Sequence, residues 1–281
     1  MRSYYLEKIK QLKIMDDDFA RIVFKDKDSS LEVLKSLGIV DYNEIVTHHE
    51  TQYDIKNPNQ RSIVLDIYVI TDKKHIDIEI ENNRSRASAK RGRLHVSEID
   101  VHLTLPNDDF EKLLDVVVVF ICSFDPFNMS LPVYTVTRMI EETNEKYNDG
   151  TKIIYVNGTY NGDDEVGRLV HDLKCTDPSL MYNETLRKRV QYFKESKGGI
   201  ESMCEIWEEI KAKGMSEGLA KGLEKGMAKG LTRGEQKGKY NSNVSSLTNV
   251  MKNLNVELKE AMMIIGIDET EYDLYASAIL K

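Results

Sequence analysis

Two neighbouring segments of the chain carry the hydrophobic and polar patterns that are typical of β-strands. Residues 62–70 form an apolar run that a single acid, Asp66, interrupts. Residues 76–81 alternate strictly between isoleucine and acid, so the acids share one face of a strand and the isoleucines share the other. These acids are Asp77, Glu79 and Glu81. Because residues 71–74 suit a short turn, we expect a hairpin in which Asp66 lies beside Glu79.

The pattern along the rest of the first 200 residues alternates between helical and extended segments. The sequence predicts helices at residues 15–24, 29–37, 85–105 and 164–173. It predicts further extended segments at residues 44–54, 115–122, 132–138 and 152–157, and a turn at residues 57–59. Ser29 or Ser30 caps the second helix and Gly38 ends it, whereas the apolar run 115–122 is typical of a central strand covered on both faces. This order predicts an α/β fold with a mixed sheet flanked by helices.

Glycine recurs at every fourth residue from Gly214 to Gly238. Each glycine makes a helix about 1 kcal/mol less stable than alanine does, so seven of them disfavour an isolated helix by about 7 kcal/mol. A period of four residues advances by about 400°, and the glycine ridge therefore winds around the helix and accepts a partner helix at close range. The flanking side chains are Met215, Leu219, Leu223, Met227 and Leu231. We expect homo-oligomerisation through this helix; a flexible charged linker is the alternative.

The sequence after the glycine repeat predicts a small helical segment at the end of the chain. Apolar residues recur there at helical spacing: Leu247, Val250, Met251, Leu254, Leu258, Ala261, Met262 and Ile265. Three parts follow from the patterns, namely a first domain at residues 1–200, a glycine-repeat helix or linker at 201–240, and the helical segment at 241–281.

Charge and composition narrow the range of functions. A formal net charge of -8 over 281 residues argues against a protein that coats nucleic acid. Locally, however, residues 84–95 contain five cations and no acid: Arg84, Arg86, Lys90, Arg91 and Arg93. No segment resembles a leader peptide or a membrane span, so we expect a cytoplasmic protein without a membrane partner. Three widely separated cysteines, Cys122, Cys175 and Cys204, are expected to be buried free thiols.

Asp66, in the apolar strand at residues 62–70, requires a compensating partner, because burial of an unpaired carboxylate is unfavourable by several kcal/mol. An acid, a short turn and an acid-x-residue triplet on the next strand are the layout of metal-dependent nucleases. Asp66 and Glu79 then hold Mg²⁺, with Mn²⁺ as the alternative cation, and the backbone carbonyl of Ile80 adds a ligand. Glu81, at the third position, helps to orient the attacking water. A solvated strand face at residues 76–81 and a solvated helix face in the basic block are the alternatives.

Several stretches together resemble a known family. They are residues 18–24, 61–67, 78–81, 90–100, 120–125, 131–134 and 154–158, followed by the glycine repeat. Over about residues 15–240 the chain resembles the recombination-promoting nuclease family, of transposase type, within the PD-(D/E)XK nuclease superfamily. The resemblance implies a restriction-endonuclease-like fold, Mg²⁺-dependent cleavage of DNA phosphodiesters, and a link to transposition-like recombination.

The resemblance also assigns roles to positions of this chain. Asp66 and Glu79 look like the metal-binding acids, and Ile80 contributes only its carbonyl. The basic helix is where we expect contacts with DNA phosphates, from Lys90, Arg91 and Arg93, and His95 lies one turn after Arg91 in reach of the same phosphates. Asp18, on the first helix, and Asp77 are accessory candidates.

One position departs from the family pattern. The third residue of the triplet is usually lysine in the superfamily and glutamine in this family, whereas here it is Glu81. An ionised glutamate neither donates a hydrogen bond nor stabilises negative charge on phosphoryl oxygens. Glu81 can instead accept a proton from water, hold a second metal, or regain a donor through a raised pKa. The alternative is a catalytically inactive DNA-binding or assembly protein, and an RNA-directed nuclease is also compatible with the sequence.

Overall fold

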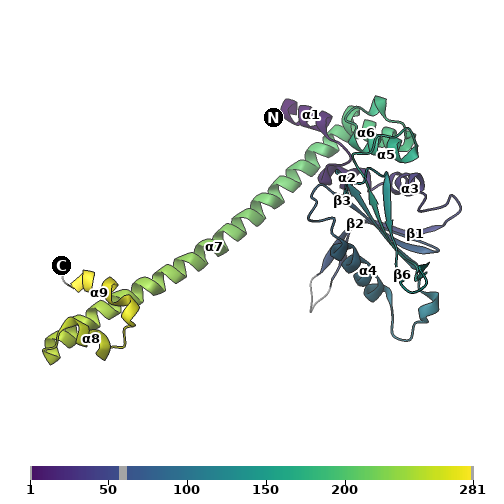
Figure 1. Cartoon of the computed structure of the whole chain (residues 1–281). Helices are drawn as coiled ribbons and strands as arrows, with labels where there is room; N and C mark the ends of the chain where they lie inside the picture. The colour runs from purple at the N-terminus through teal and green to yellow at the C-terminus, as the bar shows by residue number, and fades with distance from the viewer. Residues whose placement is uncertain (1, 57–61, 280–281) are drawn as a thin grey trace. The chain divides into compact units, whose positions relative to one another are not determined.

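The computed structural model describes residues 2–56 and 62–279 (Figure 1). The turn expected at residues 57–59 lies outside the described residues. The chain divides into two compact units, Met1–Glu205 and Ile206–Lys281.

The first unit is built on a six-stranded mixed sheet in the order β1-β2-β3-β4-β8-β5. Strands β3, β4 and β8 pair in parallel, whereas β1 with β2, β2 with β3, and β5 with β8 pair antiparallel. The strands are β1 (Val46–Ile55), β2 (Ile63–Thr71), β3 (Lys74–Glu81), β4 (Asp115–Cys122), β5 (Val133–Val136) and β8 (Thr151–Val156). A separate two-stranded ribbon of β6 (Met139–Ile140) and β7 (Glu145–Lys146) has no counterpart in the sequence prediction. The predicted α/β fold with a mixed sheet is confirmed.

The predicted hairpin is also present. In the β2–β3 pair, Ile67 lies opposite Ile78 and Tyr68 lies opposite Asp77. Strand β4, the apolar run, is buried along nearly its whole length and lies between β3 and β8, as a strand covered on both faces requires. The carboxyl ends of β3 and β4 therefore lie next to each other inside the sheet.

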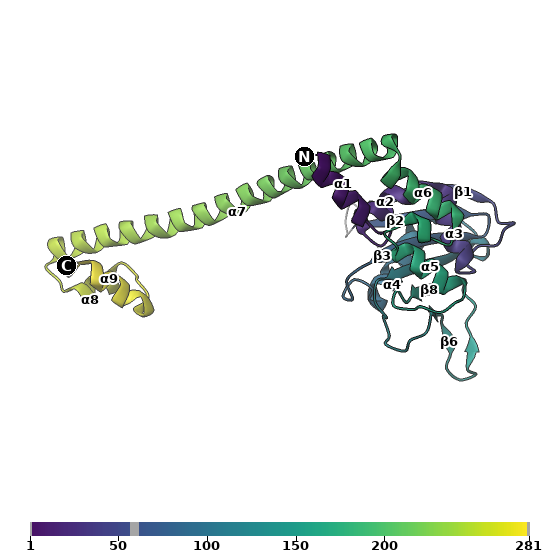
Figure 2. The same cartoon turned by 90° about the horizontal axis from the view of Figure 1, so that it is seen from above.

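Helices cover both faces of this sheet. The helix α4 (Ala89–Leu103) packs against β4 and β8 on one face, and α2, α3, α5 and α6 lie on the opposite face (Figures 1 and 2). The bounds of the other helices are α1 (Arg2–Gln11), α2 (Asp17–Val23), α3 (Lys27–Ser36), α5 (Glu165–Lys174) and α6 (Glu184–Glu195). The sequence prediction did not include α1 or α6. Short 3-10 turns, η1 (Phe110–Lys112) and η2 (Pro178–Leu180), complete the unit.

Three local predictions have different outcomes. The cap of α3 is Asp26, whose side chain accepts a hydrogen bond from the Ser29 backbone N–H at 3.0 Å, so the predicted serine cap is wrong. Gly38 adopts a φ of 64° and ends α3 as expected. Of the three free thiols, Cys122 is buried, whereas Cys175 and Cys204 are only half-buried.

The second unit contains most of one long helix, which begins in the first unit, and two short helices. Helix α7 (Lys197–Leu254) includes the whole glycine repeat, so residues 201–240, for which a flexible linker was the alternative, are helical. It passes residue 240 without a break; α8 (Leu258–Ile264), η3 (Glu269–Glu271) and α9 (Tyr272–Ile279) follow. The core of this unit contains Leu247, Ala261, Met262, Ile267 and Tyr275. Leu254, expected in that core, is exposed. Among the described residues, no helix combines the length and the apolar character that a bilayer crossing demands.

Candidate active site

The pairing of strands β1 and β2 is irregular at Gln52 and Asp66, and the side chains of β2 change from one face of the sheet to the other at this point. The neighbouring residues of the two strands pair across the sheet, whereas Gln52 and Asp66 do not pair. In a regular strand, residues 65 and 68 would lie on opposite faces, yet Leu65 and Tyr68 belong to the same core cluster under α4. Gln52 adopts a φ of 58°, which is uncommon for a residue other than glycine. This irregularity aims the side chain of Asp66 at the end of β3.

The Asp66 carboxylate is held from several directions. Its Oδ1 accepts a hydrogen bond from Gln52 Nε2 at 3.0 Å and lies 3.9 Å from Arg21 Nη2. Its Oδ2 lies 3.4 Å from the backbone nitrogen of Ile80, which donates to it. The backbone N–H of Asp66 in turn donates to Glu79 Oε1 at 3.0 Å. The expected placement of Asp66 beside Glu79 is therefore confirmed, whereas no sequence pattern pointed to Gln52 or Arg21.

The three acids of β3 are buried. Asp77 and Glu79 have no exposed surface and Glu81 is 1% exposed, so the alternative of a solvated strand face is wrong. They share the face of the sheet on which α4 packs, because they pair in register with the α4-facing residues of β4. Arg91 of α4 compensates two of them: Nη2 donates to Glu79 Oε2 and Nη1 donates to Glu81 Oε1. Helix α4 therefore directs the side chain of Arg91 toward the buried acids of the sheet.

His95 belongs to the same cluster. Its Nδ1 lies 2.7 Å from Asp77 Oδ2 and 3.9 Å from Glu79 Oε1. The sequence placed His95 at the DNA phosphates, whereas its side chain is only 2% exposed and faces Asp77. The reason is that His95 and Arg91 are four residues apart and lie on the same face of α4. Asp77, an accessory candidate in the sequence, lies at the centre of the cluster instead.

A glycine allows α4 to approach the sheet this closely. A Cβ atom at Gly92 would lie 3.0 Å from Ile153 Cδ1 and 3.2 Å from Phe120 Cε2. These separations are shorter than normal van der Waals contacts between carbon atoms. Gly92 thus determines how far Arg91 and His95 reach toward the carboxylates.

The electrostatics of the cluster disfavour charge on its buried groups. Burial raises the pKa of Asp77 well above its ordinary value, and the neighbouring Asp66 carboxylate raises it further. Burial likewise raises the pKa of Glu79, with additional contributions from Asp77 and Asp66. Burial lowers the pKa of His95. Arg91 opposes the raised pKa of Asp77 and Glu79 only in part and lowers the pKa of His95 further, whereas a bound cation would favour the ionised carboxylates.

The donor set fits a divalent cation. Asp77, Glu79 and His95 each offer one ligand atom, and these atoms lie within 4.8 Å of one another. Oδ1 of Asp77 is buried and has no hydrogen-bond partner in the described part of the chain, which leaves one carboxylate oxygen uncompensated. Asp66 and Glu79 adjoin this set, and the Ile80 backbone contacts Asp66 through its N–H.

A groove of about 550 Å³ opens beside the cluster. Arg91 and His95 line it together with Arg86 and Lys90, whereas Arg93 is exposed elsewhere on α4. The Nε atom of Arg86 lies 3.6 Å from Glu81 Oε1. Of the four residues predicted at DNA phosphates, Lys90, Arg91 and His95 therefore line the groove, and Arg93 does not.

The remaining accessory candidate connects to the site through a neighbour. Asp18, on the first turn of α2, lies 4.0 Å from Arg21, and Arg21 lies 3.9 Å from Asp66. The same helix is joined to the end of β3 by Asn82, whose Nδ2 donates to Met15 O at 2.8 Å and to Asp17 Oδ1 at 2.9 Å. Asp18 thus acts on Asp66 only by way of Arg21.

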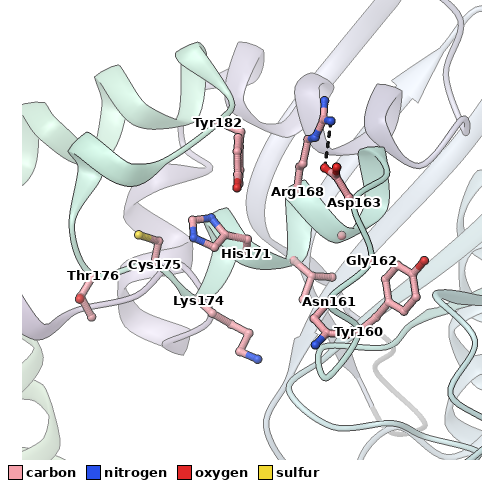
Figure 3. A pocket seen from close by; sticks show the side chains of 12 residues that line it. Tyr160, Asn161, Gly162, Asp163, Arg168, His171, Lys174, Cys175, Thr176 and Tyr182 are labelled. Atoms are coloured by element: carbon pink, nitrogen blue, oxygen red, sulfur yellow. Dashed lines mark hydrogen bonds and ion pairs between the residues drawn. The ribbon is translucent and has the colours of Figure 1, made fainter.

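A second hollow, of about 640 Å³, lies along α5 (Figure 3). Tyr182 lies over His171, with ring centroids 4.9 Å apart, and Arg168 donates to Asp163 at 3.0 Å. Lys174 donates to the carbonyl of Gly158 at 2.9 Å. Neither the cluster acids nor Arg91 and His95 line this hollow, so it is separate from the candidate site.

Comparison with known proteins does not assign this chain to a family. No family model, no curated protein and no solved structure matches this chain. The interpretation of the site therefore depends on the residues and their geometry.

Proposed function

We propose that the chain is a Mg²⁺-dependent DNA endonuclease of transposase type with a restriction-endonuclease-like fold. The observation that carries the proposal is the placement of Asp66 against Glu79 and Ile80, at the end of a hairpin whose buried acids face a basic helix. This is the arrangement that the sequence resemblance to the PD-(D/E)XK nucleases implies. The adjoining cationic groove supports a phosphodiester substrate.

The residues take distinct roles in phosphodiester hydrolysis. Asp66, Glu79 and the carbonyl of Ile80 are the groups that would hold Mg²⁺ or Mn²⁺. When bound, such a cation activates water as a nucleophile and neutralises charge that develops on the phosphate. Lys90 and Arg86, at the groove, bind backbone phosphates, and Gln52 orients Asp66.

Arg91 offers an explanation for Glu81 at the third position of the triplet, where the family pattern has lysine or glutamine. Its guanidinium contacts both Glu79 and Glu81, and thus places positive charge and hydrogen-bond donors where the superfamily has lysine. Glu81, paired with Arg91, is positioned to accept the proton of the attacking water. In this proposal the Glu81–Arg91 pair replaces a single lysine or glutamine.

Nicking of supercoiled plasmid tests the proposal. The purified chain should nick DNA with Mg²⁺ or Mn²⁺ and not with EDTA, and Asp66→Ala should lower the rate at least about a hundredfold, because loss of a metal ligand exceeds the effect of an outer-shell change. Asp54→Ala, an exposed acid on the neighbouring strand, is the matched control and should retain the rate. Equal nicking by wild type and Asp66→Ala would exclude the assigned site.

The rival proposal is a catalytically inactive DNA-binding or assembly protein, and Glu81 is the observation that favours it. Its signature is retention of DNA on a gel without nicking, together with recovery of nicking in Glu81→Gln or Glu81→Lys. DNA and a second copy of the chain, through α7, are the proposed partners. A cytoplasmic location stays a prediction from the sequence.

A further inference from the structure

We propose that Asp77, Glu79 and His95 bind a second divalent cation, of the transition-metal class that includes Zn²⁺, separate from the Mg²⁺ position at Asp66 and Glu79. One nitrogen and two carboxylate oxygens form its ligand set. Imidazole suits zinc and related first-row metals, whereas Mg²⁺ prefers oxygen ligands alone. The inference does not depend on nuclease activity.

The distances are close to those of a metal site. In a tetrahedral zinc site, ligands about 2.1 Å from the ion are about 3.4 Å from one another. His95 Nδ1 lies 2.7 Å from Asp77 Oδ2 and 3.9 Å from Glu79 Oε1, and so brackets that separation. Small side-chain rotations therefore bring the three atoms around one ion.

An independent observation is the uncompensated oxygen of Asp77. The side chain is fully buried, and within the described residues Oδ1 has no hydrogen-bond partner. A buried carboxylate oxygen without a partner is unfavourable by several kcal/mol unless a proton or a cation compensates it. The hydrogen bond from His95 reaches only the other oxygen, Oδ2, so an ion that replaces this hydrogen bond and binds both oxygens of Asp77 would also compensate Oδ1.

The neighbouring charged groups are compatible with a cation between Asp77, Glu79 and His95. Arg91 occupies Oε2 of Glu79, so Oε1 is the oxygen that faces His95. Asp66 contributes a further negative charge nearby, yet it is not among the three residues whose ligand atoms lie within 4.8 Å of one another. The two sets therefore share Glu79 and differ in their other ligands.

The groove provides access to the ion. His95, one of the three proposed ligands, lines it together with Arg91, so a hydrated cation in the groove lies next to the cluster on the α4 side of the sheet. Once bound, the ion would fix Glu79 before DNA arrives. We infer that it stabilises the folded site rather than participating in phosphodiester cleavage.

Calorimetric titration of the full chain, stripped with EDTA and free of DNA, tests the second site with Zn²⁺ and Mg²⁺ separately. We expect one Zn²⁺ per chain in wild type and a higher temperature of unfolding. His95→Gln should weaken Zn²⁺ binding at least about tenfold, because even outer-shell changes reach that range. The isosteric Asp77→Asn should do the same, and serves as the second test if His95→Gln does not fold.

Two controls separate this inference from the nuclease proposal. His102→Gln removes another α4 histidine, one that contacts Tyr53 instead of the cluster, and should leave Zn²⁺ affinity unchanged. Asp66→Asn should weaken Mg²⁺ binding and spare Zn²⁺ binding. Absence of Zn²⁺ binding in wild type, or equal affinity in the folded His95→Gln or Asp77→Asn chain, overturns the second site whatever the nicking assay shows. Zn²⁺ binding that needs Asp77 and His95, in a chain that never nicks DNA, supports this site and contradicts the nuclease proposal.

Discussion

At the residue scale, Gln52 is the least expected contributor to the site. Its backbone adopts a φ of 58°, and its side-chain amide donates to Asp66 Oδ1 at 3.0 Å. A left-handed backbone at a residue other than glycine is unfavourable by about 1 kcal/mol, and such conformations cluster at functional sites. Gln52 contacts a metal-binding candidate without belonging to the ligand set, and we therefore interpret it as a positioning residue.

We predict that Gln52→Ala lowers the rate of plasmid nicking by roughly tenfold, because Asp66 loses the hydrogen bond that orients it. The concentration of Mg²⁺ needed for half-maximal nicking should rise, a change that a purely structural role would not produce. Thr51→Ala, at the adjacent half-buried position, is the matched control and should leave both quantities unchanged. Wild-type metal dependence in Gln52→Ala would show that Asp66 needs no such support.

The residues show which parts of the site can be predicted from sequence. Strand alternation and a short turn were sufficient to place Asp66 beside Glu79, because both depend only on local geometry. The left-handed conformation of Gln52 has no signature in a residue type that rarely adopts it. His95 and Arg91 were expected at the surface because a basic block without acids resembles a solvated face. Their partners come from β3, and only tertiary packing brings these elements together.

At the element scale, the approach of α4 to the sheet depends on Gly92. We predict that Gly92→Leu lowers the free energy of unfolding by about 2 kcal/mol, because its side chain would overlap Ile153 and Phe120 and force α4 outward. Nicking should be lost as well, since Arg91 and His95 move with the helix. Chemical denaturation and the plasmid assay measure the two effects.

Gly218→Leu is the control for this substitution. It makes the same change inside a helix, at a position where an added Cβ meets no atom within 4 Å. Leucine there should increase helix stability by up to about 1 kcal/mol. If Gly92→Leu and Gly218→Leu behave alike, close packing of α4 is not what holds Arg91 and His95 in place.

The elements also show where sequence patterns were insufficient. Strand β4 was predicted at its observed bounds because an uninterrupted apolar run, here residues 116–122, has few other interpretations. Helix α6 was missed although its buried residues Leu186, Val190 and Phe193 recur at helical spacing. Charged residues dominate the segment between them, and only packing against other helices of the unit makes the apolar stripe effective.

At the scale of the whole molecule, the glycine repeat of α7 requires an explanation that one chain does not supply. Its apolar residues, which include Met215, Leu219 and Leu223, are 64–74% exposed. An added Cβ at any glycine from Gly214 to Gly238 would meet open space. Because the apolar positions wind around the helix by about 40° per repeat, they suit a partner helix that coils with them. A second copy of the chain carries the same ridge.

We predict opposite effects of one triple substitution on helix stability and on assembly. Gly218→Ala, Gly222→Ala and Gly226→Ala together should stabilise α7 by about 3 kcal/mol, since each alanine is about 1 kcal/mol more favourable than glycine. The added methyl groups should nevertheless keep a partner helix at a distance, and so weaken the self-association that we expect of the wild-type chain. Sedimentation equilibrium measures the association, and circular dichroism measures the helix content.

The control for this prediction raises helix propensity without filling the ridge. Ser216→Ala and Thr232→Ala replace exposed residues that are not glycine, and they should leave the sedimentation profile unchanged. If the triple alanine chain assembles as tightly as wild type, the glycines are not the surface of closest approach. If wild type itself sediments as a monomer, α7 is a connector between the two units and its repeat requires another partner.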